Sequence, residues 1–230
     1  MPETKPIIIA IDGPAGAGKS TVARNLARRL GLLYVDSGAT YRAAALKAIE
    51  SGVSLEDESR VADAVSAAEI RLDPSPSKPR VFLDARDVTT EIRTPEVTLA
   101  ASQISRFPAV RGKLVSLQRS LTCGRSVVME GRDIGTVVFP DAQLKIFLKA
   151  NLEERTRRRA EQDAQEGRTS ALKKIVEEVS KRDRMDSERK ISPLVAAPDA
   201  HVIDSTNLTA DEVVGRIVQL ARQQNLLPLS

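Results

Sequence analysis

Residues Gly13-Pro14-Ala15-Gly16-Ala17-Gly18-Lys19-Ser20 match the pattern G-x-x-x-x-G-K-[ST] of a phosphate-binding loop. An apolar run at 7–11 precedes the loop, and a helical pattern follows it. Glycines let backbone N–H groups surround phosphate oxygens, the lysine reaches the outer phosphates, and the serine hydroxyl can ligate Mg²⁺. A glycine-rich turn that binds nothing can match by chance. The strand before and the helix after favour nucleotide binding instead.

Further apolar runs occur at 32–35, 127–129, 144–148 and 201–203. Helical patterns separate them, the first ending at Gly31 and the last running from about 210 to 224. Short buried strands that alternate with helices are typical of α/β proteins. The sequence therefore predicts a three-layer P-loop fold, with a central parallel sheet and helices on both faces.

A long segment, about 38–125, separates the second and third of these predicted strands. Within it, 69–72, 80–83 and 88–92 resemble short antiparallel strands, and a Pro/Ser-rich turn at 73–79 follows the first. Helical patterns follow at 97–105 and 108–121. One crossover helix needs less chain than this, so we expect an inserted substructure.

The composition indicates one globular unit, because 41% hydrophobic and 29% charged residues are ordinary values. A net charge of +4 is too small to imply nucleic-acid binding. One cysteine, Cys123, and one histidine, His201, disfavour a zinc site or a Cys-His pair. We expect both to be structural. No run reaches membrane-spanning length, and residues 1–6 lack a signal pattern, so we expect a cytoplasmic protein.

The segment 153–190 is rich in arginine. The densest cluster is Arg155, Arg157, Arg158 and Arg159. One interpretation is a solvated helix face, because Glu153/Arg157, Glu154/Arg158 and Arg157/Glu161 have i,i+4 spacing. The other is a set of cations that folds over ATP, and the nearby phosphate loop favours it.

A second helical pattern places Arg182, Asp186 and Arg189 within roughly 60° of one another, beside its apolar stripe. Arg182 and Asp186 could simply form a surface ion pair. Three such groups leaning toward the buried side favour a site for phosphate and hydroxyl groups.

Charged turns follow two predicted strands, at 36–42 and 130–133. Ser37 and Asp133 could be helix caps, which is the usual role of such residues. Ligands of parallel sheets gather at the carboxyl ends of the strands, however. We therefore expect a second substrate there.

Together these residues resemble the bacterial cytidylate kinases, a family of nucleoside monophosphate kinases. The resemblance covers nearly the whole chain and rests on 11–21, 36–42, 91–94, 101–103, 131–140 and 204–206. It implies a core domain (1–37, 122–150 and 191–230) and a monophosphate-binding region (38–121) with a small antiparallel sheet at about 69–92. A short lid with its following helix would occupy 151–190.

The resemblance also implies the site residues. ATP would contact Gly13, Pro14, Ala15, Gly16, Ala17, Gly18, Lys19, Ser20, Thr21, Arg157 and Arg158. The cytosine would meet Ser37, Ser102, Arg111 and Asp133, the acceptor phosphate Arg42, Arg132 and Arg189, and the sugar Arg182 and Asp186. The catalytic set would be Lys19, Arg132, Asp133, Arg182 and Arg189. Either Ser20 or Thr21 would hold the metal. Glu130 replaces an aspartate of the family pattern.

The reaction implied is transfer of phosphate from ATP, with Mg²⁺, to CMP or dCMP. Cytosine presents acceptors at N3 and O2 and a donor at N4, so a donating Arg111 and an accepting Asp133 would favour it over uracil. Rival hypotheses are a kinase for UMP, AMP or a small metabolite, and a nucleotide-dependent switch, although no Asn-Lys-x-Asp motif occurs. An RNA-binding module would lack aromatic platforms. We expect a monomer with no nucleic-acid or membrane partner.

Overall fold

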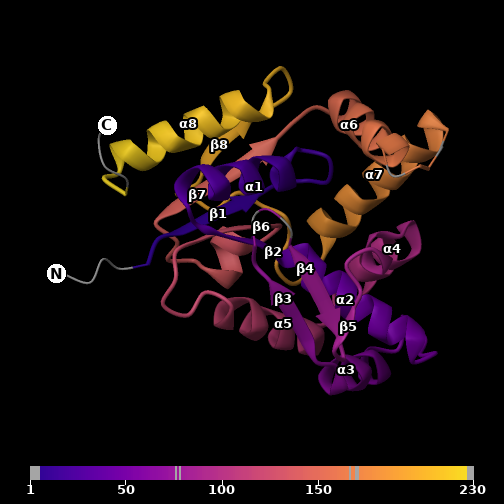
Figure 1. Cartoon of the computed structure of the whole chain (residues 1–230). Helices are drawn as coiled ribbons and strands as arrows, with labels where there is room; N and C mark the ends of the chain where they lie inside the picture. The colour runs from indigo at the N-terminus through magenta and orange to yellow at the C-terminus, as the bar shows by residue number, and fades with distance from the viewer. Residues whose placement is uncertain (1–5, 76, 78, 166, 169–170, 227–230) are drawn as a thin grey trace.

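The structure is a computed structural model that describes residues 6–75, 77, 79–165, 167–168 and 171–226. The predicted lack of a signal pattern at the N-terminus therefore concerns residues that are mostly outside the described ranges. Parts of the 73–79 turn and of the 151–190 segment also lie outside these ranges. Figure 1 shows a central sheet with helices packed around it. Within the described ranges, no helix has the length and apolar character needed to cross a bilayer.

The central sheet has five parallel strands in the order β2-β6-β1-β7-β8. This confirms the predicted parallel sheet and all five predicted core strands. The first strand, β1, pairs with both β6 and β7, so the phosphate loop that follows it begins at the middle of the sheet. The strands are β1 (Ile8–Asp12), β2 (Leu33–Asp36), β6 (Val127–Gly131), β7 (Leu144–Lys149) and β8 (His201–Asp204).

Successive side chains along a strand point to opposite faces of the sheet. Each face is covered by its own apolar cluster, so both faces are buried. Ile9 and Ile11 pack in one apolar cluster with α1 (Lys19–Leu30) and α8 (Ala210–Gln223). Ala10 packs in the other cluster. That second cluster contains residues of α2 (Ser37–Glu50), α4 (Pro95–Ile104) and α5 (Pro108–Ser120). The predicted three-layer α/β fold is confirmed.

The inserted segment begins with α2 and α3 (Glu58–Ala67) and continues into a three-stranded antiparallel sheet. Its strands are β3 (Ile70–Asp73), β4 (Arg80–Leu83) and β5 (Arg86–Asp87). This segment also covers one edge of the main sheet, where the Tyr34 backbone N–H donates to the carbonyl of Pro74 at 3.1 Å.

The prediction of a third strand at 88–92 is wrong, because β5 ends at Asp87. Val88 and Ile92 are both fully buried, and the Ile92 N–H donates to the Val88 carbonyl at 3.0 Å. A spacing of four residues buries one face of a helical turn, and the chain there enters the 3₁₀ turn η1 (Glu91–Arg93). The β-branched composition suggested a strand, but the apolar spacing favoured the turn.

The segment after β7 forms two helices, α6 (Leu152–Gln165) and α7 (Leu172–Glu188), that pack against each other. The second helix also contacts α4 of the inserted segment. Figure 1 shows this hairpin beside α1, with α7 directed back toward the centre of the molecule. The hairpin thus brings its charged residues close to the carboxyl ends of β1, β2 and β6.

The last helix begins with a reciprocal cap that gives a simple stability test. Glu212 donates its backbone N–H to the Thr209 hydroxyl at 3.2 Å, and its carboxylate accepts from the Thr209 backbone N–H at 2.7 Å. Thr209→Ala should lower the free energy of unfolding by about 1 kcal/mol. Thr209→Ser, which keeps the hydroxyl, should restore most of the loss. Urea denaturation of the three proteins measures this, and equal midpoints would contradict the role of the cap.

Candidate active site

The phosphate loop joins β1 to α1 and depends on glycine at two points. A Cβ at Gly13 would lie 2.0 Å from the Leu148 carbonyl oxygen, so no side chain fits there. Gly18 precedes α1 with φ of 87°, in the left-handed region. The loop leaves the first N–H groups of α1 without helical partners, which suits an anion. Lys19 folds back over the loop, where its Nζ donates to the Pro14 carbonyl at 2.7 Å.

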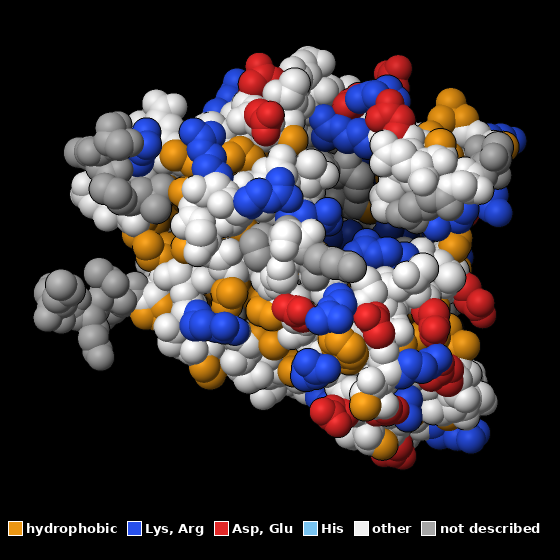
Figure 2. Space-filling model, viewed as in Figure 1, with side chains coloured by type: hydrophobic (Ala, Val, Ile, Leu, Met, Phe, Trp, Pro, Cys, Tyr) orange, Lys and Arg blue, Asp and Glu red, His pale blue; other side chains and the backbone are white. Residues whose placement is uncertain are grey.

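A cavity of about 1050 Å³ runs from this loop to α4 and α7. Figure 2 shows Lys and Arg side chains gathered in the hollow beside the α6–α7 hairpin. Most predicted site residues line the cavity: Ala15, Gly16, Gly18, Lys19, Ser20, Thr21, Ser37, Arg42, Ser102, Arg132, Asp133, Arg158, Arg182, Asp186 and Arg189. Predicted residues outside this lining are Gly13, Pro14, Ala17, Arg111 and Arg157.

At the α7 side of the cavity, Asp186 accepts from Arg132 Nε at 2.7 Å. The alternative of an Arg182–Asp186 surface ion pair is therefore not what the structure shows. Burial, with repulsion from Arg132, lowers the pKa of Arg182 to about 10. Among the described residues, Arg182 Nε and Arg189 Nη2 are buried without a hydrogen-bond partner. An anion in the cavity would satisfy both.

At the opposite side, Arg42 Nη2 donates to Asp36 Oδ2 at 2.6 Å. Burial would raise the pKa of Asp36, but the Arg42 and Arg93 guanidinium groups outweigh it and hold this pKa below its usual range. Arg93 also lines the cavity and was not singled out in the sequence. The ionised Asp36 therefore holds the Arg42 guanidinium at the cavity wall, and Arg93 adds a second cation there.

Asp133 and Arg111 form a buried ion pair. Arg111 also donates to the Ser105 carbonyl at 3.3 Å and lies over the Tyr41 ring, 5.7 Å from its centroid. The pair places one carboxylate in the cavity wall with a guanidinium directly behind it. Ser102, on α4, lines the same end of the cavity, and its hydroxyl donates to the Thr98 carbonyl at 3.5 Å.

The capping alternative is wrong for both residues to which it applied. Asp36, rather than Ser37, caps α2, because its side chain accepts from the Ala39 N–H at 3.1 Å. Asp133 precedes the wide π-type turn η2 (Ile134–Val138) without a side-chain capping bond. Ser37 and Asp133 instead face the cavity.

Sequence reasoning missed Asp12, which holds the turn after β6. Its two carboxylate oxygens accept from the N–H groups of Ile134 and Gly135, each at 2.8 Å. Burial outweighs these bonds and raises the pKa of Asp12 to about 6. The turn carries Arg132 and Asp133, so Asp12 ties them to the start of the phosphate loop. An acidic residue at the end of a buried strand was the only sequence signal.

Glu130 is enclosed between the phosphate loop and β2. Its Oε2 accepts from the Ser20 hydroxyl at 3.0 Å, and its Oε1 accepts from the Tyr34 hydroxyl at 2.6 Å. Burial, with the nearby Asp36 charge, raises the pKa of Glu130. Hydroxyl and carboxylate oxygens are the donors that Mg²⁺ prefers, so this pair fits that ion. The described part of the chain holds no cluster of three or more acidic, His or Cys ligands.

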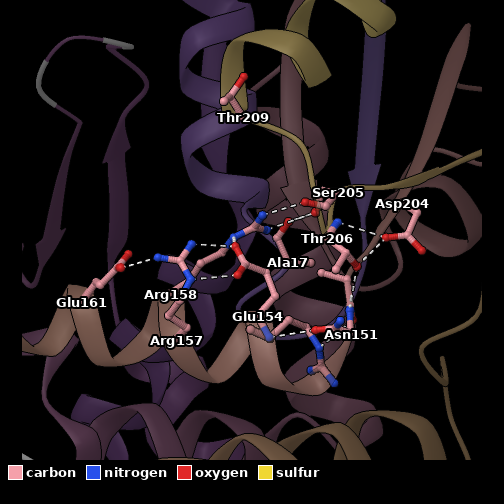
Figure 3. A network of polar contacts seen from close by, with 12 residues as sticks. Ala17, Asn151, Glu154, Arg157, Arg158, Glu161, Asp204, Ser205, Thr206 and Thr209 are labelled. Atoms are coloured by element: carbon pink, nitrogen blue, oxygen red, sulfur yellow. Dashed lines mark hydrogen bonds and ion pairs between the residues drawn. The ribbon is translucent and has the colours of Figure 1, made fainter.

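Arg157 and Arg158, both on α6 and both expected to contact ATP, lie differently (Figure 3). Arg157 has a side chain that is 57% exposed and pairs with Glu161, as the solvated-face interpretation predicts. Its second partner is Glu154 rather than the expected Glu153. Arg158 lines the cavity and pairs with Glu154 at 2.7 Å. Arg155, not assigned a role in the sequence, donates to the Ala15 carbonyl at 3.1 Å. The first turns of α6 are thus attached to the phosphate loop.

Comparison with known proteins gives one consistent family. The cytidylate kinase family model matches residues 9–223. A cytidylate kinase from Pelotomaculum thermopropionicum is 54% identical, over 91% of this chain and 93% of that protein. One from Mycobacterium avium is 46% identical, over 95% and 96%. An uncharacterized protein from Eubacterium ventriosum has a similar fold, with a TM-score of 0.50, 14% identity, and coverage of 94% and 98%.

The raised pKa of Asp12 predicts a pH-dependent stability difference. Because folding favours its protonated form, the wild type loses stability as pH rises from the ordinary 3.8 through about 6. Asn cannot ionise, so Asp12→Asn should gain up to about 3 kcal/mol relative to wild type between about pH 4 and pH 7.5.

Urea unfolding of both proteins across this pH range measures the difference. Leu26→Ala serves as the control, because it changes no ionisable group and lies at a fully buried position. It should lower the free energy of unfolding by the same amount at every pH. A difference between wild type and Asp12→Asn that stays flat with pH would contradict the raised pKa.

Proposed function

Because this chain belongs to the cytidylate kinase family, we propose that it transfers the γ-phosphoryl group of ATP to CMP and dCMP, giving ADP with CDP or dCDP. The observation that carries this proposal is the single cavity of about 1050 Å³ that a phosphate loop and acceptor-side arginines line together. This volume lies at the upper end of the usual range for a ligand site, and its lining combines the phosphate loop with arginines of other elements, as a site for two phosphorylated ligands requires.

We propose that ATP places its phosphates on the loop, at the N-terminus of α1. Burial and the nearby Arg132 lower the pKa of Lys19 to about 7. The phosphates of ATP would favour the charged form of Lys19, because opposite charges at short distance raise the pKa of an ammonium group. Arg158 would add a second cation beside the loop.

Mg²⁺ would be held by Ser20, with Glu130 behind it. We favour Ser20 over Thr21 because its hydroxyl is 3.0 Å from Glu130 Oε2. The ion usually takes its remaining ligands from phosphates and water, which agrees with so small a protein donor set. When bound, it would neutralise phosphate charge and help to orient the transferred group.

We propose that CMP occupies the other half of the cavity. Its phosphate would lie among Arg42, Arg132 and Arg189, and its sugar near Arg182 and Asp186. The unsatisfied Arg189 Nη2 supports a phosphate at this side of the cavity, and the unsatisfied Arg182 Nε supports an oxygen acceptor beside it. The base would meet the end of the cavity that contains Ser37, Ser102 and the Arg111–Asp133 pair.

The chemistry needs no covalent nucleophile. An oxygen of the acceptor phosphate attacks the γ-phosphorus of ATP, and the β,γ-bridging bond breaks toward ADP. The protein contributes alignment and positive charge, which are the main sources of catalysis in phosphoryl transfer. Arg132 and Arg182 would stabilise the charge that builds up between the two nucleotides. The ion pair to Asp186 holds Arg132 in position before the substrates arrive.

The division of the chain follows from these roles as part of the proposal. Residues 1–37, 122–150 and 191–230 would form the core, 38–121 would carry the acceptor, and 151–190 would close over ATP. Closure would expel water from the reacting phosphates. We further propose that the chain acts as a monomer without nucleic-acid or membrane partners.

The first test offers CMP, dCMP, UMP, AMP and GMP singly with ATP and Mg²⁺, and identifies the diphosphate formed. Fast turnover of CMP and dCMP alone is the expected result. Turnover of UMP or AMP instead would keep a monophosphate kinase but overturn the base assignment. Slow ATP hydrolysis that no acceptor stimulates would favour the nucleotide-dependent switch.

Base selection should depend on Asp133. Asp133→Asn replaces an acceptor by an amide that can also donate, so it should lower kcat/KM for CMP by about 10- to 100-fold and raise relative activity with UMP. The KM for ATP should be unchanged. Asp141→Asn, an exposed position, is the matched control and should behave as wild type. Equal loss of ATP and CMP affinity in Asp133→Asn would contradict the assignment.

A further inference from the structure

Ser205, the residue after β8, joins three segments that are far apart in the sequence (Figure 3). Its side chain is buried. Its hydroxyl is within donating distance of two carbonyl oxygens, that of Ala17 at 3.1 Å and that of Lys149 at 3.2 Å. The same hydroxyl accepts from Arg158 Nη1 at 3.0 Å. One buried oxygen therefore connects the phosphate loop, the end of β7 and helix α6.

Arg158 is held in one orientation by this contact and two others. Its Nη2 donates to the Ser205 carbonyl at 2.7 Å, and its Nε donates to Glu154 Oε1 at 2.7 Å. A Cβ added to Gly18 would lie 3.4 Å from Arg158 Nη1. The guanidinium thus lies beside the residue where α1 begins, at the end of the helix that attracts phosphate.

The residues on either side of Ser205 attach the start of α6 to the connection between β8 and α8. The Thr206 hydroxyl accepts from the Asn151 backbone N–H at 3.0 Å and donates to Asp204 Oδ1 at 2.6 Å. The Asn151 side chain accepts from the Glu154 N–H at 2.8 Å, at the first turn of the helix. Arg158 therefore extends from a helix whose beginning is anchored.

We infer that Ser205 is a positioning residue for ATP, which holds the Arg158 guanidinium beside the phosphate loop before the nucleotide binds. This inference rests on the proposed function for the identity of the nucleotide. An arginine that is already oriented loses less rotamer freedom when it contacts phosphate, so ATP binds more tightly.

The test is a double-mutant cycle of four proteins: wild type, Ser205→Ala, Arg158→Met and the variant with both changes. Ser205→Ala removes the hydroxyl and keeps the carbonyl contact, and should raise the KM for ATP by about tenfold with the KM for CMP unchanged. In the Arg158→Met background the same change should have almost no further effect, because the group that Ser205 positions is absent. An equal rise in both backgrounds would overturn the inference.

Thr209→Ala is the matched control, because it removes a hydroxyl from the same connection without touching Arg158. Both alanine variants should lower the Tm, but only Ser205→Ala should change the KM for ATP. A purely structural role would make the two variants alike, which would also overturn the inference.

Calorimetric titration with ATP alone separates failure of the inference from failure of the proposed function. If Ser205→Ala weakens ATP binding through Arg158 while no acceptor is phosphorylated, the inference stands and the acceptor assignment fails. If wild type and Ser205→Ala bind ATP equally and turn over CMP, the inference fails and the proposed function stands.

Discussion

Ion pairs hold several of the arginines around the cavity in place, and the rest of the site depends on them. Removing one partner of a buried ion pair costs about 3–5 kcal/mol, because the other charge is left without water. Here Arg42 pairs with Asp36, and Arg132 pairs with Asp186. Two further pairs follow the same rule: Arg111 with Asp133 and Arg155 with Asp183. In each pair the two residues come from different parts of the fold; Asp36 ends β2, and Arg42 is on α2, the next element. The pairs therefore hold the elements together as well as the charges.

The sequence predicted the core of this arrangement well because its signals are local. Apolar runs indicated all five strands of the main sheet, and the loop pattern located the N-terminus of α1. The third strand of the small sheet was predicted at 88–92 rather than at 86–87, because the β-branched residues there suggested a strand, whereas the spacing of Val88 and Ile92 buries one face of a helical turn. Helical spacing brought Arg182, Asp186 and Arg189 to one cavity.

Pairing between distant elements was beyond the sequence. Asp186 was weighed as a partner of Arg182, four residues away, and pairs with Arg132 instead. The contacts of Asp12 with the turn after β6, and of Glu130 with Tyr34, exist only because parallel strands lie side by side in the sheet. Composition and spacing carry no information about which strand lies next to which. Many charged residues of the cavity lining were singled out in the sequence, but their partners were not.

The bond between Tyr34 and Pro74 bears on how the folded chain behaves at high concentration. An open edge strand offers unpaired N–H and carbonyl groups to any extended peptide, and so invites association between copies. Pro74 supplies a carbonyl to β2 at 3.1 Å and cannot donate a backbone N–H of its own. The connection that leads out of β3 thus ends the hydrogen-bonding pattern of the main sheet. A segment inserted for the acceptor nucleotide would at the same time make this edge a poor template for aggregation.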